Sequence, residues 1–188
     1  MVLTLTICNK GLKKMKKMFS AMLLCSAMVL TARENLLING SFEETNAKGA
    51  LKGWYLFKDA KIVSDAADGK QAVMIKNNRI ATAQFNIKPG KYTLKFKAKK
   101  AAKAWCGFGF ICDDKENKQI KSKTLNAYFG TKEANPQWTQ FEFPVEFPEN
   151  IKGRTYLLIS INDKKTDLFV DDVQLIKKDT TSPTQAKK

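Results

Sequence analysis

The feature of this sequence that most constrains its fold is the alternation of apolar and polar residues in short segments. Segment 92–98 is the clearest case: Tyr, Leu, Phe and Ala take the first, third, fifth and seventh places, with Thr or Lys between them. Successive side chains of a strand point to opposite faces, so this spacing puts the apolar residues on one face of a sheet. No long stretch after residue 32 shows the i, i+3, i+4, i+7 apolar spacing of an amphipathic helix. We therefore expect an all-β fold.

Other segments show the same strand pattern. Strands are predicted over residues 73–76, 81–87, 104–112, 139–147, 155–162 and 168–176. The turn Lys88-Pro89-Gly90-Lys91 separates 81–87 from 92–98, and Pro followed by Gly at its centre suits a type II turn. We expect these two strands to form a hairpin. Many short strands with turn residues between them indicate two packed antiparallel sheets.

The first 32 residues have the layout of a secretory leader. Lysines at positions 13, 14, 16 and 17 precede an apolar run over residues 18–30, which is the order of charge and apolarity that such leaders have. The run is shorter than the roughly 18 apolar residues that a membrane-spanning helix needs. We therefore expect export to the periplasm, the cell surface or the medium, without a membrane span.

Several details of the leader have alternatives. Cleavage could follow Ala32, or Ala27 within Cys25-Ser26-Ala27, which has the small-x-small pattern that signal peptidases accept. A translation start at Met15 would leave a complete leader. Lipid attachment at Cys25 is a weaker alternative, because Leu23 and Leu24 precede it instead of small residues.

The rest of the chain has the length of one domain. We expect a domain over residues 33–178, long enough to bury a core without metal or disulfide support, and a flexible polar tail over 179–188. Five of the 33 basic residues lie in the leader, so the remainder carries 28 basic and 18 acidic residues, a net charge of +10. Such a balance favours contact with anionic partners but does not identify one.

Two cysteines remain after the leader, Cys106 and Cys112. In an extended strand their Cα atoms would lie about 20 Å apart, whereas a disulfide needs them within about 7 Å. We expect both to be buried free thiols.

The residue inventory argues against catalysis. The chain has no histidine, which excludes Ser-His-Asp and Cys-His nucleophile pairs and histidine metal sites. Asp113-Asp114 and Asp171-Asp172 are adjacent in sequence, so in a strand their carboxylates point to opposite faces and do not flank one glycosidic bond. We expect that the protein is not an enzyme.

Five short motifs carry a family resemblance that covers residues 35–177. They are Asn-Gly-x-Phe-Glu at 39–43, Gly53-Trp54, Pro-Gly-x-Tyr-Thr-Leu at 89–94, Trp-Thr-Gln-Phe at 138–141 and Val-Asp-Asp-Val at 170–173. In this order and spacing the chain resembles CenC-type carbohydrate-binding modules of the galactose-binding-like superfamily. The resemblance implies a jelly-roll β-sandwich of two antiparallel sheets.

The resemblance also implies a structural calcium ion where the first and last motifs meet. Carried over to this sequence, its ligands would be Glu43 and Asp171 or Asp172, with backbone carbonyls near Lys70 or Gln71. Calcium takes six to eight oxygens, and carboxylates within apolar strands are costly to bury unless they are paired or metal-bound. The alternative is that these acids pair with lysine or stay solvated.

Modules of this kind bind sugars by stacking aromatic rings on them, because a sugar ring has an apolar face and a polar rim. Trp105 alternates with core residues and shares its predicted face with Gly107 and Gly109, which leave room for close approach. Trp105 is therefore the leading ligand contact, with covering of the sheet as the alternative. Tyr128 and Phe129 are predicted as a second stacking surface.

Lysines give a hypothesis about the charge of the ligand. If segment 92–99 pairs beside 104–112, then Lys95, Lys97 and Lys99 share the outward face with Trp105. Lys95 and Lys97 would then contact an anionic glycan, whereas the alternative is a solvated lysine face. Binding by such exposed charges would weaken as salt rises.

Three classes of function follow from these observations. The first is a non-catalytic carbohydrate-binding module of an exported protein, monomeric, with a polysaccharide or oligosaccharide as partner and no nucleic acid. The second is a structural or adhesion module that contacts a protein or the cell surface. The weakest is a small glycan-active enzyme with carboxylates drawn from Glu142, Glu146 and Asp113.

Overall fold

Strands make up more than half of the residues that the computed structural model describes, which are 34–130 and 134–178. The predicted leader and tail lie outside the described residues. In chain order the elements are β1 (Trp54–Leu56), β2 (Lys61–Val63), β3 (Ala72–Lys76), β4 (Arg79–Thr82), β5 (Phe85–Asn86), β6 (Gly90–Lys100), β7 (Cys106–Asp114), the 3₁₀ turn η2 (Lys123–Leu125), β8 (Asn126–Phe129), β9 (Asn135–Phe147), β10 (Ile151–Ile161) and β11 (Asp167–Lys177).

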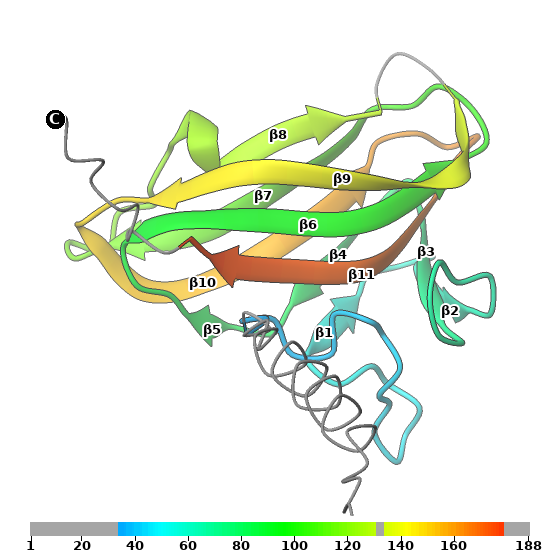
Figure 1. Ribbon diagram of the computed structural model, residues 1–188, viewed down its shortest axis with the longest axis horizontal. Coiled ribbons are helices and arrows are strands. Elements are labelled where there is room, and N and C mark those ends of the chain that lie inside the picture. The colour runs from blue at the N-terminus through cyan, green and yellow to red at the C-terminus, as the bar shows by residue number, and fades with distance from the viewer. Residues whose placement is uncertain (1–33, 131–133, 179–188) are drawn as a thin grey trace, which may run out of the picture. The chain divides into compact units, whose positions relative to one another are not determined.

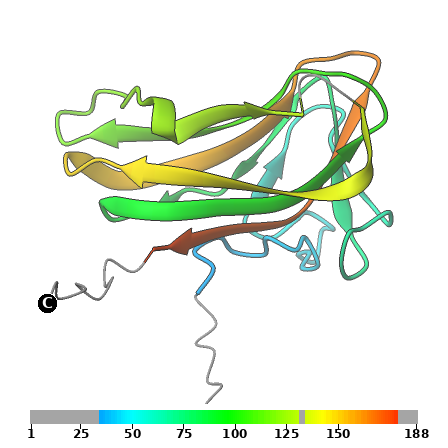
Figure 2. The ribbon, with the colours of Figure 1, turned by 45° about the horizontal axis from the view of Figure 1, so that its top comes forward.

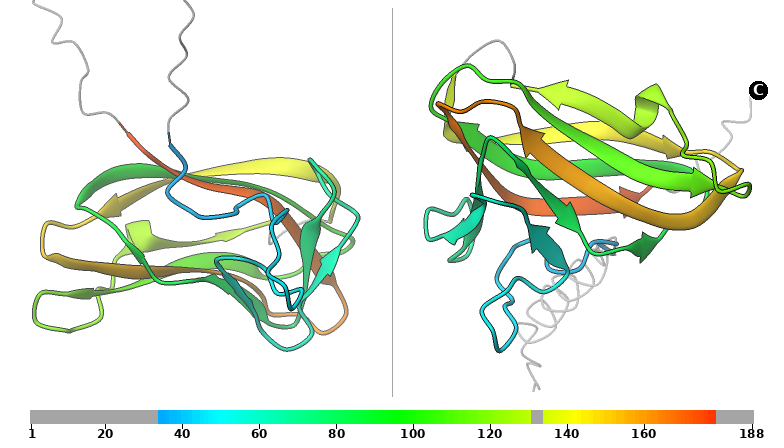
Figure 3. Two further views of the ribbon diagram at one scale, coloured as in Figure 1. Left: turned by 90° about the horizontal axis from the view of Figure 1, so that it is seen from below. Right: turned by 180° about the vertical axis from the view of Figure 1, so that it is seen from behind.

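The strands form two antiparallel sheets that face each other (Figures 1 and 3). The first sheet has the order β1-β4-β10-β7-β8, and β5 also pairs with β10. The second sheet has the order β2-β3-β11-β6-β9, and Figure 2 shows its long strands β11, β6 and β9 running side by side. The predicted all-β sandwich is confirmed. No helix within the described residues is long and apolar enough to cross a membrane.

Alternation along the strands separates core from surface as the sequence predicts. In β6, Tyr92, Leu94 and Phe96 are at most 2 % exposed, whereas Lys95 and Lys97 on either side of Phe96 stay partly exposed. Burying one such large apolar side chain contributes about 1.5–3 kcal/mol. The core therefore draws its stability from the inward positions of both sheets.

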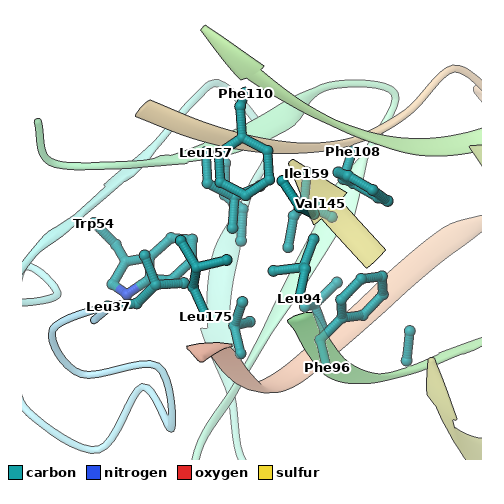
Figure 4. Close-up of a cluster of buried hydrophobic side chains, with 14 of the residues drawn as sticks. Leu37, Trp54, Leu94, Phe96, Phe108, Phe110, Val145, Leu157, Ile159 and Leu175 are labelled. Carbon is teal, nitrogen blue, oxygen red and sulfur yellow. The ribbon is translucent and has the colours of Figure 1, made fainter. Parts of the chain in front are cut away.

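Aromatic rings fill the space between the sheets. Phe96 of β6 packs against Phe129 of β8, with ring centroids 4.9 Å apart, and stacks beside Phe141 and Phe143 of β9 at 5.6 and 5.9 Å. Because these rings come from both sheets, they hold the two layers together. Figure 4 shows the wider buried cluster: Leu37, Trp54, Leu94, Phe96, Phe108, Phe110, Val145, Leu157, Ile159 and Leu175.

The predicted hairpin around the turn 88–91 is wrong. Phe85 of β5 pairs with Thr155 of β10 in the first sheet, whereas β6 pairs with β11 and β9 in the second. The turn therefore carries the chain from one sheet to the other. Alternation reports which residues face the core, and that pattern is the same in both sheets, so it does not show which sheet a strand joins.

The segment of the first motif, which forms turns, meets the last motif. The Asn35 side chain accepts from the backbone N–H of Leu175 at 2.9 Å and donates to the carbonyl of Val173 at 3.1 Å. Gly40 lies against the same carbonyl, where an added Cβ would stand 1.8 Å from the oxygen. Glycine at position 40 thus has a steric reason, since only glycine allows the backbone to approach the Val173 carbonyl this closely.

Cys106 and Cys112 are free and buried on the inner side of β7, which confirms the sequence-based prediction. Burial raises the pKa of the Cys106 thiol to about 11 and also raises the pKa of Cys112. Because the thiolate is the reactive form, both side chains act as small apolar core residues.

Candidate functional site

Exposed aromatic side chains gather on the outer side of the first sheet. Large hydrophobic residues exposed in its strands, or directly before them, are Tyr55, Trp105, Ile111, Tyr128 and Tyr156. In the described part of the chain, no strand of the second sheet carries an exposed one. We call the outward surface of β1, β4, β10, β7 and β8 the aromatic face. Exposed apolar groups gathered on one face mark interaction sites.

Trp105 and Tyr128 form a corner at one end of the aromatic face. Trp105 directly precedes β7 and Tyr128 lies in the neighbouring strand β8. They are 61 % and 72 % exposed, and their ring centroids lie 5.4 Å apart at an interplanar angle of 82°. The backbone carbonyl of Trp105 accepts from Asn162 at 2.9 Å, which anchors its strand end. The structure thus brings together two of the predicted ligand contacts.

The two glycines beside Trp105 have different surroundings. An added Cβ at Gly107 would stand 3.2 Å from Tyr128 Cδ1 and 3.2 Å from the carbonyl oxygen of Ala127. Tyr128 therefore leans over Gly107. At Gly109 an added Cβ would meet only the Asn126 Cβ, at 3.8 Å. The outer side of Gly109 is open, as the sequence analysis expected for both glycines.

Strand pairing sets a row of residues across the aromatic face. Tyr55 pairs with Ala81, Ala81 with Leu158, Leu158 with Gly109, and Gly109 with Asn126. Paired residues point to the same face, so an exposed tyrosine stands at one end and an amide at the other, with small or apolar residues between them. The row crosses four strand spacings, about 19 Å at about 4.8 Å each. This is long enough for several sugar units.

Tyr55 is an exposed aromatic residue of this face that was not predicted from the sequence. Its ring is 60 % exposed, whereas Trp54 beside it is 4 % exposed and donates its indole N–H to the carbonyls of Ile38 and Asn39, both at 3.1 Å. Because side chains alternate along a strand, a buried Trp54 indicates that Tyr55 points outward. Placing it on the same face as Trp105 needed the pairing of β1 with β4, which no local pattern reports.

Phe129 is not a free stacking surface. It is 5 % exposed and packs against Phe96 and Phe141, with ring centroids 4.9 and 5.1 Å away. Because Tyr128 points outward, alternation along β8 turns Phe129 into the core. Of the two neighbours predicted from the sequence, only Tyr128 belongs to the aromatic face.

Lys95 and Lys97 lie on the other sheet from Trp105. They belong to β6, which pairs with β11 and β9, so the expected pairing of segment 92–99 with 104–112 is wrong. Lys95 contacts Glu142 at 3.0 Å and Lys97 contacts Asp172 at 3.5 Å. The lysine face is therefore partly neutralised by its own sheet. This prediction and that of the hairpin are wrong for the same reason, because both pair strands that are close in sequence but belong to different sheets.

Lys99 continues the lysine row in a partly buried position. Its ammonium group lies 2.6 Å from an Asp65 carboxylate oxygen and about 5 Å from two aromatic rings, 5.0 Å from the centroid of Trp138 and 5.2 Å from that of Phe169. A cation held between rings and a carboxylate stabilises the sheet. These contacts leave little of Lys99 for a ligand.

Glu43 and Asp171 hold one loop, which leads into β3. Glu43 Oε1 accepts from the N–H groups of Lys70 and Gln71 at 2.7 and 2.8 Å. Asp171 is fully buried, and its Oδ2 accepts from the N–H groups of Ala67 and Asp68 at 2.8 and 3.1 Å. Its Oδ1 accepts from the following N–H at 2.7 Å. Burial raises the pKa of Asp171, while these hydrogen bonds oppose the rise.

This arrangement does not fit a calcium shell. Three of the four carboxylate oxygens of Glu43 and Asp171 accept N–H groups, whereas calcium needs six to eight oxygens turned toward it. Asp172 pairs with Lys97 and Gln174 instead. Over residues 34–130 and 134–178, no three His, Cys, Asp or Glu side chains group as a metal site. One buried oxygen, Oε1 of Gln71, has no donor. Calcium here stays a prediction that a chelator test decides.

Comparison with known proteins identifies the fold through solved structures. No protein-family model and no curated protein matches the chain. A family 16 carbohydrate-binding module superposes with a TM-score of 0.56 at 18 % identity, covering 76 % of this chain and 100 % of the module. The CBM22-1 xylan-binding domain of Paenibacillus barcinonensis Xyn10C gives 0.54 at 16 %, covering 78 % and 96 %. TmCBM61 in complex with β-1,4-galactotriose gives 0.51 at 18 %, covering 77 % and 99 %. The chain therefore shares the sandwich fold of these modules.

Proposed function

We propose that the chain is a non-catalytic carbohydrate-binding module that holds a polysaccharide or oligosaccharide on the aromatic face. The observation that carries this proposal is the corner of Trp105 and Tyr128, both more than half exposed on one sheet. Solved structures with the same fold include a xylan-binding domain and a galactotriose complex. The CenC-type motifs and the leader-like first 32 residues support an exported member of this group.

The chemistry of the aromatic face suits sugar rings. The apolar C–H face of a pyranose packs on an aromatic ring, while hydroxyl groups at its rim need polar partners. Trp105 and Tyr128 supply two ring faces at nearly a right angle. Asn126 and the Tyr128 hydroxyl supply donors and acceptors on the same strand. A sugar unit at this corner would thus meet both kinds of group.

A glycan array followed by calorimetry tests the proposal. We expect one or more plant or microbial polysaccharides to bind, and Trp105→Ala to weaken that binding at least tenfold, which corresponds to about 1.4 kcal/mol. Trp105→Phe should retain part of the affinity because it keeps a flat apolar ring. The melting temperature should not change, since the side chain is exposed.

Ile38→Ala provides the matched control, because Ile38 is 62 % exposed but lies outside the strands of the aromatic face. It should leave glycan binding unchanged. A blank array, or full binding by the double variant Trp105→Ala/Tyr128→Ala, would overturn the proposal and favour a module that contacts a protein or the cell surface.

A further inference from the structure

Strand pairing places an arginine in the same row as Tyr128. Arg79 opens β4 and pairs with Ser160 of β10, which pairs with Gly107 of β7, which in turn pairs with Tyr128 of β8. This row lies beside the one that ends in Tyr55. Three strand spacings, about 14 Å, separate Arg79 from Tyr128. A glycan stacked at the Trp105 corner and extended across β7 and β10 therefore reaches the guanidinium group.

Arg79 is held in place without an acidic partner. Its guanidinium carbon lies 4.9 Å from the centroid of Phe57, and the residue is exposed. None of the ion pairs among the described residues includes Arg79, whereas Lys95, Lys97 and Lys99 each have a carboxylate. Arg79 is thus available for a ligand, whereas these three lysines of the second sheet are engaged.

Local hydrogen bonds fix the backbone that carries Arg79. The Asn78 side chain donates to the carbonyl of Lys58 at 3.0 Å and accepts from the N–H of Arg79 at 3.0 Å. The Asn78 carbonyl accepts from Ile161 at 2.9 Å. These bonds tie the start of β4 to β10 and to the segment after Phe57. The arginine and the ring that it stacks on therefore keep their relative position.

Stacking leaves the binding edge of the guanidinium free. The cation–π contact with the Phe57 ring takes up no hydrogen-bond acceptor, and among the described residues no ion pair engages the guanidinium N–H groups. The planar fork matches a carboxylate or sulfate, to which it donates two parallel hydrogen bonds. Because stacking already restricts the side chain, less conformational entropy is lost when an anion binds.

We propose that the aromatic face selects glycans that carry a carboxylate or sulfate group, and that Arg79 is the residue that binds this group about three strand spacings from the sugar stacked on Trp105 and Tyr128. This inference rests on the proposed function. It replaces the lysines of the second sheet with an arginine on the sheet that carries the aromatic rings.

Other charges on this sheet provide the control. Arg154 of β10 pairs with Asn86 of β5, away from the row of Arg79, and Asp113 lies in β7 beyond Ile111. Arg154→Gln changes the net charge as much as Arg79→Gln does. The pair of variants thus separates a specific contact from the general attraction of a basic protein, whose formal net charge is +15.

The experiment measures the affinity of the full chain for two matched pairs of oligosaccharides. One pair is an oligogalacturonate and the same oligomer with its carboxyl groups reduced. The other is a glucuronoxylan oligomer and its reduced form, and a sulfated xylan oligomer distinguishes sulfate from carboxylate. We expect an acidic member to bind at least fivefold more tightly than its neutral counterpart, and this preference to shrink as salt rises.

The variants then test the role of Arg79. Arg79→Gln should abolish the preference and leave binding of the neutral oligomer unchanged, Arg79→Lys should retain part of it, and Arg154→Gln should retain it in full. Three results would overturn the inference: no preference in either pair or for the sulfated oligomer, a preference that survives Arg79→Gln, or an equal loss with Arg154→Gln. Binding of a neutral glycan that depends on Trp105 would still support the proposed function, so the two failures are distinguishable.

Discussion

The outer surfaces of the two sheets differ although one alternating pattern builds both. On the first sheet, Trp105 and Tyr128 are more than half exposed and contact each other, and Tyr128 lies over Gly107. On the second, Lys95 and Lys97 contact carboxylates of β9 and β11, and the Asp171 carboxylate beside them holds a loop. Polar groups of the second sheet thus serve the fold, whereas aromatic groups of the first remain available for a ligand.

This difference teaches that exposure by itself does not distinguish a structural surface from a binding surface. What matters is whether the outward groups already have partners in the chain. Removing a partnered group from the second sheet should cost stability, and removing an unpartnered ring from the first should cost binding. The predictions below test that division.

The largest effect is expected for Asp171→Ala. Three backbone N–H groups would lose their acceptor in a buried place, and each unsatisfied group costs about 1–3 kcal/mol, part of which water recovers. We expect the free energy of unfolding to fall by about 3 kcal/mol in urea titrations. Glycan affinity should change less than twofold, because this carboxylate lies on the second sheet.

Asp172→Asn is the control for Asp171→Ala. The Asp172 side chain is 30 % exposed, and its backbone φ of 50° suits asparagine better than alanine. Loss of its contact with Lys97 should cost less than about 1 kcal/mol. If Asp171→Ala abolished glycan binding while the fold stayed stable, the division between the two surfaces would be wrong.

A smaller effect separates the two glycines of the aromatic face. Gly107→Ala puts a methyl group 3.2 Å from both Tyr128 and a backbone oxygen, so we expect a loss of about 1 kcal/mol in stability, the low end for overpacking, and weaker glycan binding as Tyr128 moves. Gly109→Ala makes only an ordinary contact and should leave stability unchanged. It should still weaken binding, because the methyl group stands on the open part of the row between Tyr55 and Asn126.

Binding that Gly109→Ala leaves intact would show that the glycan stays at the Trp105 corner and does not cross the sheet. Calorimetry for affinity and urea titration for stability, measured on the same preparations, distinguish these outcomes.

Smaller still are the expected effects of Lys95→Gln and Lys97→Gln. Each removes one partly exposed ion pair, which contributes about 0–1 kcal/mol. Affinity for acidic glycans should not change, because both lysines lie on the sheet opposite the aromatic face. If affinity for acidic glycans fell as much as expected for Arg79→Gln, the anionic group would bind at the lysine face that the sequence predicts.

Local pattern was enough to predict much of the fold. Alternation predicted the apolar inward residues of β6, and it predicted Trp105 as outward while Cys106 is buried. In β11 it does not hold throughout, because the register shifts between Asp171 and Gln174. Sheet membership could not be predicted in this way, because it depends on contacts between distant segments. For this reason the turn at 88–91 predicts a hairpin that does not form, and the lysines of β6 lie on the other sheet from Trp105.

The candidate site shows the same limit. Trp105 and Tyr128 were each predicted from nearby residues, but Tyr55 and Arg79 reach the aromatic face only through the pairing of β1 and β4 with β10. Arg79 also follows Asn77-Asn78, a turn-like pair that hides the start of its strand. Site residues that are brought together by pairing of distant strands are therefore the hardest to predict from a single sequence.

The smallest effect is expected when calcium is added or removed. The family resemblance and the structure predict different effects on the melting temperature. The resemblance implies that calcium bridges Glu43 and Asp171 or Asp172, so chelator should lower the melting temperature and calcium should raise it by mass action. The structure instead gives three of their four oxygens to backbone N–H groups. These hydrogen bonds already hold the loop, and a cation would have to displace them. We therefore expect the melting temperature to be the same with chelator and with added calcium.

Gln71 makes this test specific, since its Oε1 is a buried oxygen beside the loop that lacks a donor. A rise in melting temperature with calcium that Gln71→Ala removes would show that the loop opens to admit the ion, with Gln71 among its ligands. Such a result would mean that the second sheet also has a ligand site, which binds calcium. Its carboxylates would then hold the loop through hydrogen bonds only when no calcium is bound.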